Sequence, residues 1–74
     1  MPRAPRYPEI VEDIREKIRE GVLRPGDPLP SIEQLKAQYE VSYGPVRTAM
    51  LVLKAEGLIR GEPGRAVFVA TQAE

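Results

Sequence analysis

The sequence predicts an α+β domain in which three helices precede a two-stranded β-hairpin. Apolar residues recur at helical spacing in three separate segments of the chain. Pro, Gly and Ser residues stand at the boundaries of these segments, and a run of alternating Val and Phe side chains follows a Pro-Gly turn near the C-terminus. With 74 residues, the chain has room for one domain only.

The first helix is predicted between Pro8 and Gly21, because proline favours the first helical position and glycine follows the last. Residues 1–6 precede it as a flexible basic arm that is too rich in proline to be helical. Three isoleucines recur every four residues and form one apolar stripe on this helix: Ile10, Ile14 and Ile18.

The second helix is predicted from Ser31 to about Glu40. Ser31 and Gln34 form a capping-box pattern, in which each side chain satisfies a free backbone amide at the start of the helix. Residues 22–30, which join the first two helices, are expected to form a loop with a tight turn at residues 25–28, Pro-Gly-Asp-Pro.

The third helix is predicted to start between Ser42 and Pro45. Ser42 is a favourable N-cap residue. Pro45 prefers the first helical position and disfavours helical geometry at Gly44, so the start within this interval stays open. The buried face then follows the i, i+3, i+4, i+7 rule through Val46, Ala49, Met50 and Leu53, and Gly57 ends the helix.

The hairpin is predicted from a short strand at residues 58–60, a turn at 61–64 and a returning strand at 65–70. Residues 71–74 form a frayed tail, so the domain spans residues 7–70. Two helices joined by a short turn form the helix-turn-helix layout, and a hairpin after the third helix makes it a winged helix-turn-helix.

The composition argues against an enzyme, a metal site and a cofactor. The chain has no Cys and no His, which removes thiol catalysis, the usual general base and the commonest metal ligands. The N-terminus is not a signal peptide and no apolar run could span a membrane, so we expect a cytoplasmic protein without a membrane partner. The formal net charge is zero, so any affinity for DNA must come from the local placement of a few basic residues.

Over about residues 7–70 the sequence resembles the GntR family of bacterial transcription regulators. The resemblance rests on a series of motifs in the family's order and spacing: Gly21, Pro25-Gly26, Leu29-Pro30-Ser31, Leu35, Val41-Ser42, Val46-Arg47, Ala49, Leu53, Glu56-Gly57-Leu58-Ile59, Gly64 and Phe68-Val69. It implies that the third helix enters the major groove of DNA and that the wing reaches toward the minor groove.

The resemblance also implies which residues would contact DNA. Ser31 and Ser42 would contact the DNA backbone, and Arg47 would be the main basic residue of the third helix that faces the major groove. Gly64, together with Arg65, would form the wing contact. The candidate set is completed by two residues in the turn into the third helix, Tyr43 and Gly44.

Tyr43 has two interpretations. It could stack on a sugar, touch a thymine methyl group or donate to a phosphate, or its ring could pack over the turn between the second and third helices. The sequence also departs from the family pattern, which commonly has Arg at the positions of Glu33 and Tyr43, small hydroxyl residues at Gly44 and Pro45, and Gly at Ala66. The DNA sequence that this domain prefers therefore cannot be transferred from the family.

The predicted function is sequence-specific binding of double-stranded DNA by a transcription regulator, with a repressor as the expected kind, lacking an effector-binding domain. We expect at most a weak homodimer that forms on DNA. The alternative is a winged-helix module for protein–protein interaction, which zero net charge and Glu33 favour. Leu51 and Val52 could mark such an interface or could extend the core against the hairpin.

Overall fold

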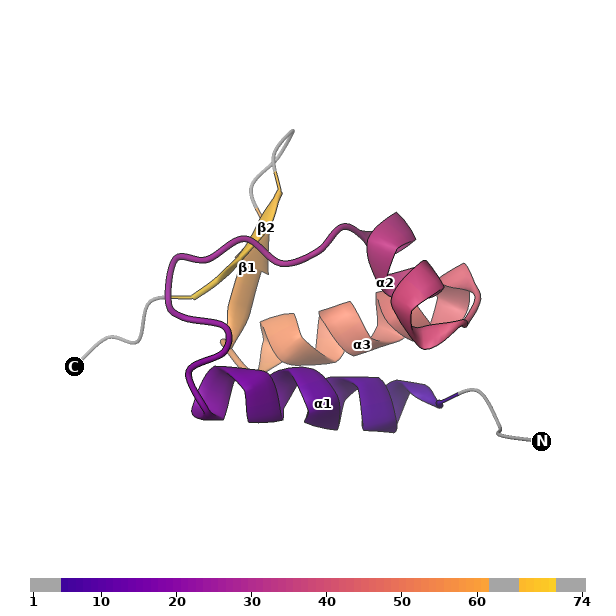
Figure 1. The fold of residues 1–74 in the computed structure, drawn as a ribbon, viewed down its shortest axis with the longest axis horizontal. Coiled ribbons are helices and arrows are strands. Elements are labelled where there is room, and N and C mark those ends of the chain that lie inside the picture. The colour runs from indigo at the N-terminus through magenta and orange to yellow at the C-terminus, as the bar shows by residue number, and fades with distance from the viewer. Residues whose placement is uncertain (1–4, 62–65, 71–74) are drawn as a thin grey trace.

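Three helices and an antiparallel hairpin follow one another in the predicted order (Figure 1). The structure, a computed structural model, describes residues 5–61 and 66–70. Its elements are α1 (Tyr7–Arg19), α2 (Ile32–Tyr39), α3 (Tyr43–Ala55), β1 (Ile59–Gly61) and β2 (Val67–Val69). No helix in these two ranges is long and apolar enough to cross a membrane.

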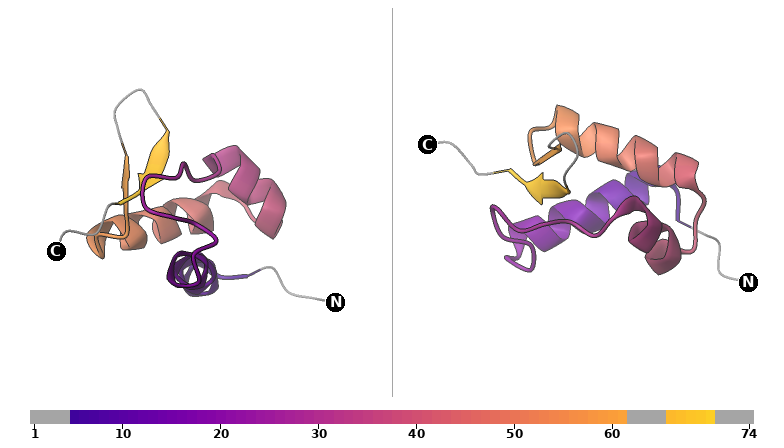
Figure 2. Two further views of the ribbon diagram at one scale, coloured as in Figure 1. Left: turned by 60° about the vertical axis from the view of Figure 1, so that its left-hand side comes forward. Right: turned by 90° about the horizontal axis from the view of Figure 1, so that it is seen from above.

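The core lies where α1 and α2 pack against α3 and where the hairpin closes one end (Figure 2). The four positions predicted for the buried face of α3 are all buried, and Ile10 and Ile14 of α1 face them. Ile18 packs against the core from its edge. The buried set is Ile10, Val11, Ile14, Leu29, Leu35, Val46, Ala49, Met50, Leu53, Ile59 and Val69. The helical spacing therefore predicted the packed faces of α1 and α3.

The start of α3 is fixed at Ser42, which is the N-cap residue. The expectation that Pro45 would force Gly44 out of helical geometry is wrong, since Gly44 and Pro45 are the second and third residues of the helix. Proline is tolerated there because the first amides of a helix have no partner within it. Gly57 has a φ of 77°, a left-handed conformation suited to glycine, and follows the last turn as predicted.

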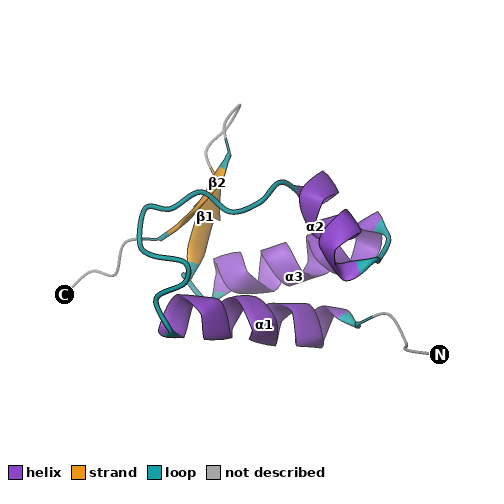
Figure 3. Cartoon of the chain, in the orientation of Figure 1, coloured by secondary structure: helices purple, strands orange, loops and turns teal. Residues whose placement is uncertain are grey.

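The segment between α1 and α2 forms a tight turn and then pairs with the hairpin. The predicted tight turn is present but lies one residue earlier, at residues 24–27, because the Asp27 amide donates to the Arg24 carbonyl oxygen at 2.9 Å and Gly26 has a φ of 89°. Residues 26–29 then run antiparallel to β2, with hydrogen bonds between Leu29 and Val67 at 2.8 Å and between Val69 and Asp27 at 2.8 Å. Figure 3 shows this loop passing alongside the hairpin. β2 is thus paired on both edges.

A hydrogen bond joins α1 to α2. The Tyr39 hydroxyl donates to Oδ2 of Asp13 at 2.5 Å, and the Lys17 ammonium lies 3.1 Å from the same oxygen. The Tyr39 bond and the Lys17 charge hold the pKa of the Asp13 carboxyl below its usual value against the opposing effect of burial. Burial, and then the bond to Asp13, raises the pKa of the Tyr39 phenol.

We expect Tyr39→Phe to lower the free energy of unfolding by about 1 kcal/mol at pH 7, the net value of one such hydrogen bond. A carboxyl whose pKa is depressed by folding stabilises the fold above its unfolded pKa, and this contribution is lost as the pH falls through the folded value. The difference between Tyr39→Phe and the parent should therefore shrink below about pH 4. Urea unfolding at pH 7 and pH 3 measures it, and an equal difference at both would contradict the assignment to ionised Asp13.

Candidate nucleic-acid interface

The start of α2, the middle of α3 and β2 meet on one side of the molecule. An open groove lies between the start of α2 and β2, with Met50 of α3 in its floor. Its lining residues are Leu29, Pro30, Ser31, Ile32, Gln34, Met50, Ala66 and Val67. In Figure 1 α1 runs along the opposite edge of the molecule from the hairpin strands. The acidic helix therefore lies away from this groove.

Ser31 is the N-cap of α2, as predicted. Its hydroxyl accepts from the Gln34 amide at 3.1 Å, and the Gln34 side chain accepts from the Ser31 amide at 2.8 Å. The same residue is exposed and lines the groove. Its capping role does not exclude a ligand, because a hydroxyl has a proton to donate as well as lone pairs.

Ser42 is also an N-cap by position, but its side chain makes no capping hydrogen bond. An N-cap hydroxyl normally accepts from the second or third amide of the helix, and here the third residue is Pro45, which has no N–H. Ser42 is exposed. The Ser42 hydroxyl therefore makes no hydrogen bond to the amides of α3, whereas the Ser31 hydroxyl accepts one from α2.

Arg47 points away from the core, as predicted. It follows buried Val46 by one residue, a rotation of about 100° around the helix. Its Nη1 donates to the hydroxyl of Tyr43, one turn earlier, at 3.1 Å. Tyr43 is 46% exposed, so it lies outside the buried core, and both interpretations of its ring stay predictions.

Lys54 is a further basic residue on this side of α3, and it was not among the predicted contacts. It is seven residues after Arg47 and therefore on the same side of the helix. Its ammonium nitrogen lies only 3.1 Å from the position that a Cβ on Gly61 would take, so it lies against the base of the hairpin. The spacing from Arg47 was the available indication.

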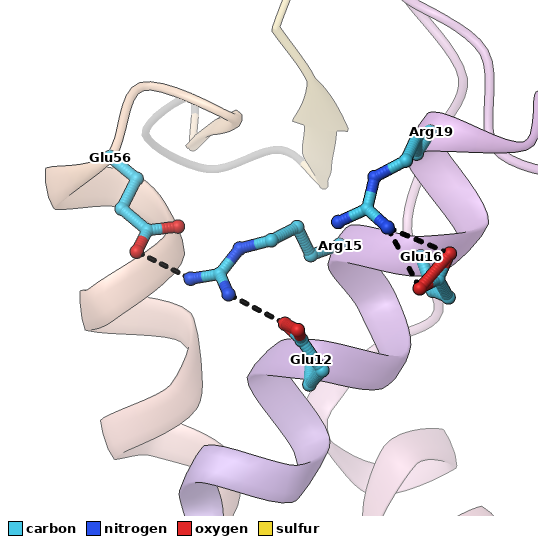
Figure 4. A network of polar contacts seen from close by, with 5 residues as sticks. All are labelled: Glu12, Arg15, Glu16, Arg19 and Glu56. Carbon is cyan, nitrogen blue, oxygen red and sulfur yellow. Dashed lines mark hydrogen bonds and ion pairs between the residues drawn. The ribbon is translucent and has the colours of Figure 1, made fainter.

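Carboxylates pair with two arginines of α1. In α1, Arg15 pairs with Glu12 at 2.6 Å and reaches across to Glu56 at the end of α3, also at 2.6 Å, while Arg19 pairs with Glu16 (Figure 4). These contacts raise the pKa of Arg15 above its usual value, mainly through the bond to Glu56.

Two further ion pairs lie within helices, between Lys17 and Asp13 of α1 and between Lys36 and Glu33 of α2. Within residues 5–61 and 66–70, neither Arg47 nor Lys54 makes an ion pair. Positive charge is therefore left uncompensated on α3 although the net charge of the chain is zero.

The remaining candidates have different outcomes. Gly64 and Arg65 lie outside the described residues, so their predicted wing contacts stay predictions. Gly44 is exposed in the first turn of α3, and outside its chain neighbours and the backbone of its own helix no atom of the described residues lies within 4 Å of where its Cβ would be. Val52 packs against the core, as one interpretation had it, whereas Leu51 is 51% exposed. Across residues 5–61 and 66–70 no cluster of side chains could hold a metal ion.

The comparison with known families decides the affiliation. Residues 6–69 match the model of the bacterial regulatory proteins of the gntR family. The chain belongs to this family. The resemblance inferred from the sequence motifs is thereby confirmed.

Two relatives of this chain are transcriptional repressors. The transcriptional repressor NagR of Bacillus subtilis is 38% identical over 66 residues, which are 89% of this chain and 27% of NagR. The repressor YtrA of the same organism is 30% identical over 70 residues, 95% of this chain and 54% of YtrA. The chain thus spans about half or less of the length of these relatives.

The solved structures confirm the winged helix-turn-helix fold. The DNA-binding domain of AraR in complex with its operator ORX1 superposes with a TM-score of 0.85 and 32% identity, covering 89% of this chain and 80% of that one. YtrA from Sulfolobus acidocaldarius, a GntR-family transcription factor, superposes with a TM-score of 0.85 and 34% identity over 99% of this chain and 62% of that one.

Proposed function

We propose that this gntR-family domain binds double-stranded DNA sequence-specifically and thereby regulates transcription, most readily as a repressor, without catalysing a reaction. The observation that carries the proposal is Arg47, exposed early in α3 and free of any carboxylate partner among the described residues. The AraR domain of the same fold is bound to operator DNA in its structure, which supports this use of the fold.

In this proposal α3 enters the major groove. An arginine guanidinium there can donate two parallel hydrogen bonds to O6 and N7 of guanine, which is the role assigned to Arg47. Ser31 and Ser42, at the starts of α2 and α3, are assigned to phosphates, which favour the free amides and positive dipole of helix N-termini. Gly64 and Arg65 are assigned to the wing contact. The acidic face of α1 points away, as repulsion by phosphates requires.

Selection of binding sites from random duplex DNA, followed by titration at several salt concentrations, tests the proposal. Each phosphate contact releases counterions, so affinity should fall steeply as salt increases and a preferred sequence should emerge. The half-exposed Leu51 favours the alternative of a protein-interaction module. Recovery of no preferred duplex, or binding that salt does not weaken, would support that alternative instead.

Gly44→Ala should stabilise the free domain and weaken DNA binding. Gly44 has neither a positive φ nor a crowded Cβ position, so alanine fits and reduces the entropy of the unfolded chain, worth about 0.4–1 kcal/mol. A methyl group in the first turn of α3 would hinder the close approach of the backbone to DNA. Thermal melting and titration on the selected site measure both effects. Unchanged affinity would remove Gly44 from the interface.

The free domain should be monomeric at micromolar concentration and should pair, if at all, on DNA. A stable dimer interface usually involves about 20–30 residues on each side. Among the described residues only four large apolar side chains are exposed: Tyr7, Val22, Tyr43 and Leu51. Sedimentation velocity with and without a selected duplex measures this. A tight dimer without DNA would be the contrary result, and Leu51 would be the first residue to test.

A further inference from the structure

The side chain that holds Arg47 is neutral, which sets this arginine apart from those of α1. Arg47 Nη1 donates to the Tyr43 hydroxyl at 3.1 Å, and the two exposed side chains are one helical turn apart. Arg15 and Arg19 are held by carboxylates instead. A carboxylate beside Arg47 would also orient it, but it would cancel the charge and repel phosphates. A tyrosine hydroxyl orients the guanidinium and leaves its charge intact.

We propose that Tyr43 is a positioning residue that presets the Arg47 guanidinium for a base edge and so sets the sequence preference of α3. The proposal rests on the proposed function, because it assigns Arg47 to a base. It differs from a direct contact of Tyr43 with DNA, since Tyr43 acts here through Arg47.

The hydrogen-bonding capacity of the guanidinium allows both contacts at once. The group carries five N–H donors in a plane, two of them on Nη1. One N–H of Nη1 is used by Tyr43. The second N–H of Nη1 and one of Nη2 remain for the O6 and N7 atoms of a guanine. A flexible arginine loses rotamer entropy when it binds, and a side chain already held in place loses less.

Gly44 and Pro45, which follow Tyr43 in α3, offer Arg47 no competing side-chain hydrogen bond. Gly44 has no side chain that could hydrogen-bond to Arg47. Pro45 has no hydrogen-bonding group in its side chain. Tyr43 is therefore the hydrogen-bond partner that the first turn of α3 offers Arg47.

A double-mutant cycle of Tyr43→Phe and Arg47→Ala, titrated on the selected duplex and on random DNA, tests the proposal. Tyr43→Phe removes only the hydroxyl and should weaken binding to the selected duplex about three- to tenfold, the equivalent of one hydrogen bond. The loss on random DNA should be smaller. In the Arg47→Ala background, Tyr43→Phe should have no further effect, since residues that act through one contact are not additive.

The matched control is Tyr7→Phe, which removes the hydroxyl of a similarly exposed tyrosine on α1, 43% against 46% for Tyr43. It should leave both affinities unchanged. The Arg47 side-chain NMR signals of the free protein give a readout without DNA, and Tyr43→Phe should shift them. Thermal melting verifies that each variant is folded.

The contrary outcomes are distinct. If the loss caused by Tyr43→Phe persists in full without Arg47, Tyr43 contacts DNA itself and the positioning role is wrong. Unshifted Arg47 signals in the free protein overturn it as well. If the parent protein selects no duplex at all, the proposed function fails first, and the positioning role fails with it.

Discussion

Leu53→Ala is expected to lower the free energy of unfolding by about 2–5 kcal/mol, the largest stability loss that a single truncation should cause here. Leu53 is fully buried, with 0% of its surface exposed, where α3 packs on α1 and the hairpin. The loss combines the transfer of apolar atoms with the cavity left behind. It is comparable with the whole stability of a domain of this size.

Leu51→Ala is the matched control for this prediction, since it makes the same truncation two residues earlier on α3. Leu51 is 51% exposed, so its removal should change the free energy of unfolding by less than about 0.5 kcal/mol. Thermal melting of both variants should show Leu53→Ala lower by about 10 °C or more and Leu51→Ala nearly unchanged. Similar melting temperatures for the two variants would mean that the packing of α3 is misassigned.

Arg47→Ala is expected to weaken binding to the selected duplex by about 1–3 kcal/mol, a factor of roughly 5 to 150, and to affect random DNA much less. The difference arises because only a base contact depends on sequence. If Arg47 neutralised a phosphate instead, both affinities would fall together and the salt slope would shrink by about one. Titrations on selected and random duplexes, each at several salt concentrations, separate the two roles.

Lys54→Ala is the control on the same side of α3. A lysine against the base of the hairpin is assigned a general electrostatic role, so its loss should lower both affinities by a similar factor. An Arg47→Ala loss of equal size on both duplexes would remove the base-reading role and keep DNA binding. Full affinity of Arg47→Ala on both would remove α3 from the interface.

Local patterns predicted the helices well because their causes are local. The spacing of Val46, Ala49, Met50 and Leu53 depends only on the helical period, and the exchange between Ser31 and Gln34 spans three residues. The start of α3 stayed open because Ser42 and Pro45 give competing local preferences. In the structure α3 begins at Tyr43, with Ser42 as its N-cap.

The contacts that the sequence did not predict join segments far apart in the chain. Nothing local to Tyr39 indicates that its hydroxyl meets Asp13, because that depends on how α1 and α2 cross. The pairing of residues 26–29 with β2 was not predicted, because the Pro, Gly and Asp residues of this segment are typical of turns. Proline is nevertheless compatible with an edge strand, where its missing N–H faces outward. The same applies to the candidate site: the outward side of α3 that carries Arg47 and Lys54 was predictable from the helical period, whereas the contact of Lys54 with the base of the hairpin was not.

The pairing of residues 26–29 with β2 also bears on how the chain folds during synthesis. The loop closed between Pro28 and Phe68 contains α2, α3 and β1, so this edge of the sheet has the greatest sequence separation among the described strand pairs. Contacts of large separation form late, because the entropy of the intervening chain opposes them. During synthesis the helices can pack against one another first, because residues 26–29 cannot pair with β2 until β2 has left the ribosome. The winged end is therefore completed last.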